Sequence, residues 1–159
     1  IGLDTTIFQS LAFKLNGLSL PLVEGELWSP VSEKLAQRKF QVSENEAGVK
    51  SVSFYLHGKD HRITMEMDHG METLYLGTES HITSKLNDHL PYTQNMRRRI
   101  GASGAWVKPN EYRAKIYLTE TPGSIMYTFR FANNRMTWTS QLRHSLFGSR
   151  NLAILKGEF

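Results

Sequence analysis

Apolar and polar residues alternate with a period of two over most of the chain from Lys39 onward. This alternation is typical of β-strands, because successive side chains point to opposite faces of a sheet. The runs expected to share one face are Val52, Phe54 and Leu56; Ile63, Met65 and Met67; Leu74 and Leu76; Tyr112, Ala114, Ile116 and Leu118; Ile125, Tyr127, Phe129 and Phe131; and Met136, Trp138, Ser140 and Leu142. The pattern therefore predicts an all-β fold.

Turn-forming residues separate these runs. They occur at His57–Asp60, Asp68–Gly70 and Thr121–Gly123, and at the pair Asn133–Asn134, where asparagine tolerates a positive φ. A last strand is expected over Leu152–Gly157. About eight short strands predict an antiparallel, up-and-down barrel of the lipocalin type, since closure leaves no unpaired edge. A β-sandwich is the alternative that the same pattern allows.

Residues 1–38 show clustered apolar residues without sustained alternation, and we interpret them as a linker and lead-in segment. Ser32 could cap a short helix near residues 32–38. Residues 39–159 are then the barrel domain. Within it, Thr78–Arg97 is polar and is predicted to be a long loop, of the kind that often contacts a partner.

Composition excludes several classes of protein. The 159 residues include no cysteine, so no disulfide, thiolate nucleophile or cysteine-based zinc site exists. The net charge of +4 is small beside the basic surfaces of nucleic-acid binders, and no apolar run approaches the roughly 20 residues of a membrane span. We predict no cofactor, no metal, no nucleic-acid partner and no membrane partner. The cellular compartment stays open, because exported proteins also lack cysteine in some cases.

Motifs of catalysis are absent. No serine has lysine three positions later, and no glycine-rich phosphate loop or His-Glu-x-x-His occurs. Ser103 in Gly101–Ala105 only approaches the spacing of a nucleophile elbow, and it lies in an expected strand. His57, His61 and His69 could approach one another across hairpins, but turns carry polar residues in any case. The chain is therefore predicted not to be an enzyme.

Two sets of residues are candidates for binding. In a barrel that is wide enough, core side chains could also line a cavity for a small apolar ligand, and the candidates are Phe54, Met65, Tyr127, Phe129 and Trp138. A second set could form an interface, namely Tyr92, Arg97, Arg98, Arg99 and Glu120. Arginines beside aromatic residues also suit single-stranded nucleic acid, which is a further alternative for Arg97–Arg99. Glu120 could orient Arg130 or Arg143 through a charge-assisted hydrogen bond.

Short motifs between Leu35 and Gly157 resemble those of a known family, the C-terminal β-barrel appended to serine hydrolases of the β-lactamase and penicillin-binding-protein class. The matching segments are Ala102–Trp106, Tyr112, Glu120–Pro122, Tyr127–Phe131, Phe147–Gly148 and Leu155–Gly157.

The resemblance implies a lipocalin-like, non-catalytic accessory domain that follows a hydrolytic domain of the same polypeptide. Such a domain would shape substrate access to the catalytic cleft or govern assembly, including a homo-oligomer. The alternative is a stand-alone, lipocalin-like binder of a small apolar ligand.

Overall fold

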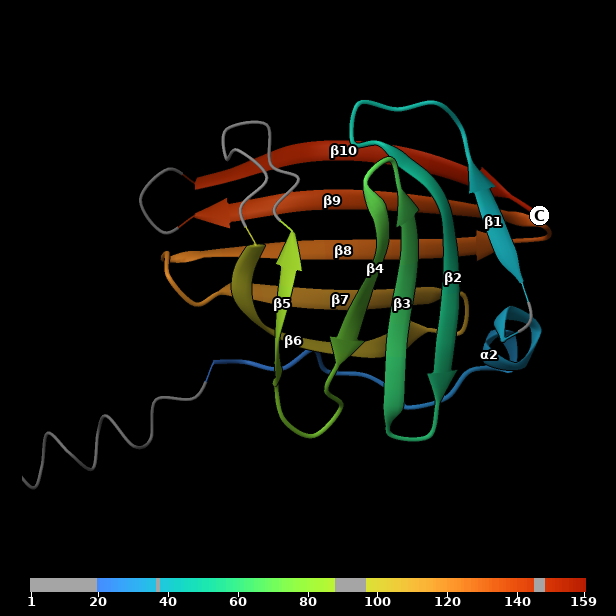
Figure 1. The fold of residues 1–159 in the computed structure, drawn as a ribbon. Coiled ribbons are helices and arrows are strands. Elements are labelled where there is room, and N and C mark those ends of the chain that lie inside the picture. The colour runs from blue at the N-terminus through green and yellow to red at the C-terminus, as the bar shows by residue number, and fades with distance from the viewer. Residues whose placement is uncertain (1–19, 37, 88–96, 145–147) are drawn as a thin grey trace, which may run out of the picture.

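The computed structural model describes residues 20–36, 38–87, 97–144 and 148–159 (Figure 1). A short helix, α2 (Pro30–Leu35), precedes the strands. The strands are β1 (Lys39–Val42), β2 (Val49–His57), β3 (Asp60–Met67), β4 (Gly70–Leu76), β5 (Ile82–Asn87), β6 (Arg97–Lys108), β7 (Glu111–Leu118), β8 (Gly123–Ala132), β9 (Arg135–His144) and β10 (Gly148–Glu158). Among the described residues, no helix is long and apolar enough to cross a membrane.

The ten strands form one antiparallel sheet in the order β4-β3-β2-β1-β10-β9-β8-β7-β6-β5. Each strand pairs with its neighbour in sequence except at two places, where β1 pairs with β10 and where β4 does not pair with β5. In Figure 1 the strands β2 to β5 lie in front of β6 to β10 and cross them. Buried apolar side chains from both groups of strands form one core cluster. The prediction of an antiparallel barrel is confirmed, and the barrel is nearly closed.

The predicted strand number was wrong, because the structure has ten strands rather than about eight. Strand β5 lies inside the segment Thr78–Arg97 that we predicted to be a loop, and residues 88–96 of that segment lie outside the described part of the chain. In β5 the apolar positions Ile82 and Leu86 flank Ser84, which pairs with buried Ile100, so the alternation is interrupted by a polar residue. Strand β10 likewise begins at Gly148 rather than Leu152.

The lead-in helix ends earlier than predicted and is capped by a different serine. The side-chain oxygen of Ser29 accepts the Val31 N–H at 3.2 Å, and the Ser32 hydroxyl accepts the Ser29 N–H at 3.2 Å. The Ser29 hydroxyl in turn donates to the Pro109 carbonyl. The cap therefore also attaches the helix to the turn between β6 and β7.

Backbone N–H and C=O groups on the edge of β6 that β5 leaves unpaired form hydrogen bonds with two other segments. Gly77 donates its N–H to the Ala102 carbonyl at 3.1 Å and accepts the Gly104 N–H at 3.0 Å. Further along, Glu26 and Trp106 exchange two backbone hydrogen bonds, of 2.8 and 2.9 Å. We call residues 20–29 the strap, and Figure 1 shows it passing along one end of the barrel toward α2. The strap and Gly77 close the sheet where β5 stops.

Close packing at Gly104 explains the small residues of β6. A Cβ atom built on Gly104 would lie 2.2 Å from the Tyr112 hydroxyl oxygen, so the side chain of Tyr112 occupies the space that a larger residue would fill. Tyr112 is itself completely buried.

Replacing Gly104 tests this packing. We expect Gly104→Ala to lower the free energy of unfolding by about 1–3 kcal/mol through overpacking against Tyr112. Gly101→Ala on the same strand is the control, because its Cβ would have its nearest neighbour at 3.7 Å. Urea unfolding measures both, and equal losses for the two variants would contradict the packing argument.

Candidate functional site

One half of the barrel interior is filled by aromatic side chains. Strand pairing places Trp106, Tyr112, Phe129 and Trp138 in one row across β6 to β9. Phe54 from β2 packs against this row from the opposite layer, with its ring centroid 5.0 Å from that of Phe129 in an edge-to-face contact. Aromatic rings bury large areas and favour such contacts. We call this part the aromatic half.

All five residues predicted to bind a ligand lie on the inward face of the barrel. The ring centroid of Trp138 lies 4.9 Å from that of Tyr127 and 5.2 Å from that of Phe129. Met65 is buried on the inner face of β3, beside the strand that carries Phe54. Tyr127 is the one member of this set that is only partly buried. The structure thus brings the predicted residues together, although their contact with a ligand remains a prediction.

Beyond the aromatic half, the inward side chains become smaller. The next row contains Gly104, Ala114, Tyr127 and Ser140, and the row after it contains Ala102, Ile116, Ile125 and Leu142. At this end Leu118 and Leu142, like Tyr127, remain partly exposed. We call these two rows and their partly exposed neighbours the small-residue half.

Polar as well as apolar side chains face the interior near β4 and β5, the two edge strands that do not pair with each other. Glu72 pairs with Met65 and is therefore on the inward face, with its side chain 11% exposed. The register of β5 and β6 places Arg98 inward beside Leu86. The Ser84 hydroxyl is buried and has no hydrogen-bond partner among the described residues. The end of the interior near this separation is therefore more polar than the rest.

At the opposite end, a buried histidine connects the strap to the barrel. His61 Nε2 lies 3.1 Å from the Leu27 carbonyl oxygen, and Nδ1 lies 2.9 Å from the Tyr112 hydroxyl. A carbonyl only accepts, so Nε2 carries the proton and Nδ1 accepts from Tyr112. Burial lowers the pKa of His61 despite the hydrogen bond to Leu27, and burial raises the pKa of Tyr112 well above its usual value. Sequence reasoning missed this connection, because its partners are distant in the chain.

The other motifs considered for chemistry have structural roles. Both ring nitrogens of His61 are engaged, and His57 is exposed, so these histidines do not form a metal site. No cluster of metal-ligating residues occurs among the described residues. Ser103 is buried on the outer face of β6, and its hydroxyl oxygen accepts the Val23 N–H at 3.2 Å. The motif around Ser103 therefore holds the strap.

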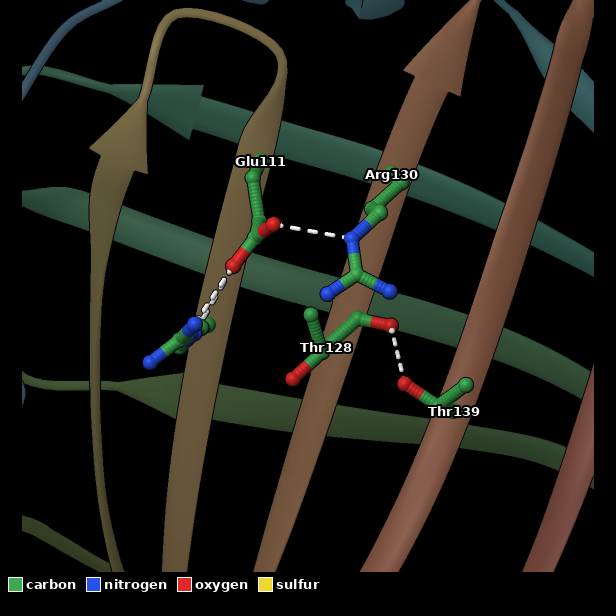
Figure 2. Close-up of polar contacts among 5 residues, drawn as sticks. Glu111, Thr128, Arg130 and Thr139 are labelled. Carbon is green, nitrogen blue, oxygen red and sulfur yellow. Dashed lines mark hydrogen bonds and ion pairs between the residues drawn. The ribbon is translucent and has the colours of Figure 1, made fainter.

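On the outer face of the barrel, Glu111 is the centre of an ion-pair network, shown in Figure 2. Arg130 Nε donates to Glu111 Oε2 at 2.8 Å, and Arg113 Nε donates to Oε1 at 2.9 Å. The Glu111 side chain is only 3% exposed. Burial alone would raise the pKa of this carboxyl, but the hydrogen bonds from the two arginines outweigh it and lower the pKa. The residue that orients Arg130 is thus Glu111 rather than the suggested Glu120, and the other suggested partner, Arg143, donates from Nε to Gln141 Oε1 at 3.2 Å.

The residues predicted as an interface do not form one described surface. Tyr92 lies outside the described residues, as does the side chain of Arg97. Arg98 and Arg99 lie on opposite faces of β6, with Arg99 exposed on the outside. The remaining member, Glu120, lies in the turn between β7 and β8. Their role in an interface stays a prediction.

The fold is that of fatty acid-binding proteins. The structure of the Schistosoma mansoni fatty acid binding protein in complex with arachidonic acid matches with a TM-score of 0.55 and 10% identity, over 80% of this chain and 97% of that chain. A fatty acid-binding protein from brain tissue of Drosophila melanogaster matches with a TM-score of 0.53 and 10% identity, over 79% and 99% of the two chains. No protein-family model and no curated protein sequence matches the chain.

These comparisons correct the resemblance to the barrel of serine hydrolases. The two similar structures named above are fatty acid-binding proteins, matched over nearly their whole length, and no family model supports an accessory domain or a catalytic partner domain. The motifs behind the resemblance reflect packing instead: Gly104 makes room for Tyr112, and Tyr127–Phe131 alternates between the two faces of β8. The prediction that the chain is not an enzyme agrees with these neighbours, both described as binding proteins.

The His61 contacts predict a loss of stability in acid. Because the pKa of His61 is lower in the folded chain than its usual value of 6.5, the unfolded chain takes up the proton first as the pH falls. The free energy of unfolding should therefore decrease below about pH 6.5. In His61→Gln the amide can donate to Leu27 and accept from Tyr112 without titrating. Between about pH 7.5 and about pH 5.5, roughly one unit either side of that pKa, the melting temperature of this variant should therefore fall less than that of the unmodified chain.

His57→Gln is the control for this experiment, because His57 is exposed on the outer face. His81, whose pKa is lowered mainly by burial, is present in all three proteins and cancels in the comparison. An acid loss that is the same in His61→Gln and in the unmodified chain would show that His61 does not cause it.

The Glu111 network predicts a difference between a buried and an exposed ion pair. Glu111→Gln should lower the free energy of unfolding by about 1.5–3 kcal/mol, since it weakens charge-assisted hydrogen bonds to two arginines. Glu158→Gln breaks the pair with Arg135, also 2.8 Å long but with side chains 66% and 76% exposed, and should cost about 0–1 kcal/mol. Urea unfolding at neutral pH measures both, and a larger loss for Glu158→Gln would refute the assignment.

Proposed function

We propose that the chain binds a small apolar ligand inside the barrel, in the small-residue half. The observation that carries this proposal is the decrease in side-chain size along the inner surface. Large rings meet one another in the row of Trp106, whereas the small side chains of Ala114 and Ser140 follow in the next row. Apolar interiors that side chains do not fill are suited to apolar ligands.

The fold supports the same proposal. Barrels of this size can hold one small ligand, and one of the two structural neighbours is described in complex with arachidonic acid. At 10% identity the likeness concerns the fold, so the choice of ligand depends on the residues of this chain.

The predicted binding residues divide into two groups under this proposal. Phe54 and Phe129, which are 2% and 0% exposed and pack against each other, form the floor on which the ligand rests. Tyr127 and Trp138 border the small-residue half and would contact the ligand directly. Met65 would adapt to the shape of the ligand through its flexible thioether.

Filling the small-residue half tests the proposal. The unmodified chain should bind one molecule of the uncharged fluorophore Nile red per barrel, displaced by methyl decanoate, and the titration is followed by fluorescence. Ala114→Leu places an isobutyl group among Gly104, Tyr127 and Ser140, and we expect it to weaken binding at least about tenfold, about 1.4 kcal/mol. Its melting temperature should change little, because the added group takes the space of the ligand.

Thr128→Leu is the matched control, since Thr128 faces outward on β8 beside the ion pairs of Figure 2. It should leave binding unchanged. A large destabilisation of Ala114→Leu, as overpacking of a filled core produces, would show that the interior has no room for a ligand.

A further inference from the structure

Trp138 carries an unused hydrogen-bond donor inside the barrel. Its side chain is 4% exposed, and its indole Nε1 is buried with no acceptor among the described residues. The indole N–H can only donate, and a buried donor without an acceptor is unfavourable. Such a group in a native structure calls for an explanation, and a ligand that supplies the acceptor is one.

The position of Trp138 connects this donor with the proposed ligand site. Its ring contacts Tyr127, which is partly buried, and Ser140 lies two residues further along the same inward face of β9. The Trp106 N–H is also unpaired, but its ring lies against Tyr112 and Phe131 and its backbone pairs with the strap. Of the two donors, only that of Trp138 borders the small-residue half.

The surroundings of Trp138 contain no described cation. Its ring neighbours Tyr127 and Phe129 are uncharged, and its pairing partner on β10 is Leu155. Arg98 also faces inward, on β6, but it lies eight residues before Trp106, which is in the same row as Trp138. Eight residues correspond to roughly 26 Å along the strand. Among the described side chains, a carboxylate placed at Trp138 would therefore find no counter-charge, which is strongly unfavourable for a buried ion.

We infer that the ligand carries an uncharged hydrogen-bond acceptor, such as an ester, ketone or amide carbonyl, that accepts the N–H of Trp138. This inference rests on the proposed function and specifies its ligand class. It also separates this chain from the Schistosoma mansoni protein, which is described in complex with arachidonic acid. The apolar remainder of the ligand would lie along Ala114 and Ser140.

Three ligands of similar length test the inference, namely methyl decanoate, decanoate and decane. Each is titrated at neutral pH by displacement of the uncharged fluorophore Nile red from the unmodified chain, Trp138→Phe and Trp106→Phe. We expect the unmodified chain to bind methyl decanoate more tightly than the other two. Trp138→Phe keeps an aromatic ring but lacks the donor, so it should lose about threefold to tenfold in affinity for methyl decanoate and little for decane.

Trp106→Phe is the matched control, because it removes the other unpaired indole N–H and should preserve the order of affinities. Tightest binding of decanoate, or equal changes for the ester and decane in Trp138→Phe, would overturn the inference while leaving the proposed function standing. Failure of the unmodified chain to bind any of the three ligands or the fluorophore would instead refute the proposed function. The comparison of ester with decane in the unmodified chain decides the question even if Trp138→Phe does not fold.

Discussion

Closure of the barrel depends on hydrogen bonds to the backbone groups of β6 that β5 leaves unpaired. Strand β5 pairs only with its first part, from Arg97 to Ala102, and backbone groups left unpaired in a closed interior are unfavourable. Gly77 and Glu26 supply the missing partners with four backbone hydrogen bonds. One of these segments ends β4 and the other belongs to the strap, so the sheet closes only when residues before β1 are in place. His61, Ser103 and Pro109 then hold the strap through further hydrogen bonds.

Closure also divides the interior into two unequal parts. The row of Trp106 to Trp138 lies toward one end, where rings from both layers meet. The opposite end holds smaller side chains, and β4 and β5 are separate there. Binding is therefore proposed on the side of the barrel where β4 and β5 do not pair.

Much of the fold follows from alternation alone. The inward sets predicted for β2, β3, β4, β7, β8 and β9 are those observed, because a residue on one face of a strand keeps its face whatever the neighbouring strand is. Strand β5 was missed, since Ser84 interrupts its apolar positions. The strap was missed because its contacts join residues about half the chain apart, and no local pattern encodes them.

The site was predictable in part for the same reason. The five candidate residues share one face by their spacing, but only the structure distinguishes Phe129, enclosed by other rings, from Tyr127, which is partly exposed. Charge partners were not predictable: Glu111, not Glu120, holds Arg130, since register across β7 and β8 decides which side chains meet. The serine hydrolase motifs misled because small and aromatic residues recur wherever a barrel wall packs closely.

The order of the strands has a consequence for how the chain folds. Eight of the nine pairings join strands adjacent in sequence, whereas the β1–β10 pairing joins Gln41 to Glu158, near the two ends of the sheet-forming chain. Hairpins form within microseconds, but a pairing this distant requires a large loss of chain entropy first. We expect the β1–β10 contact to form late in folding.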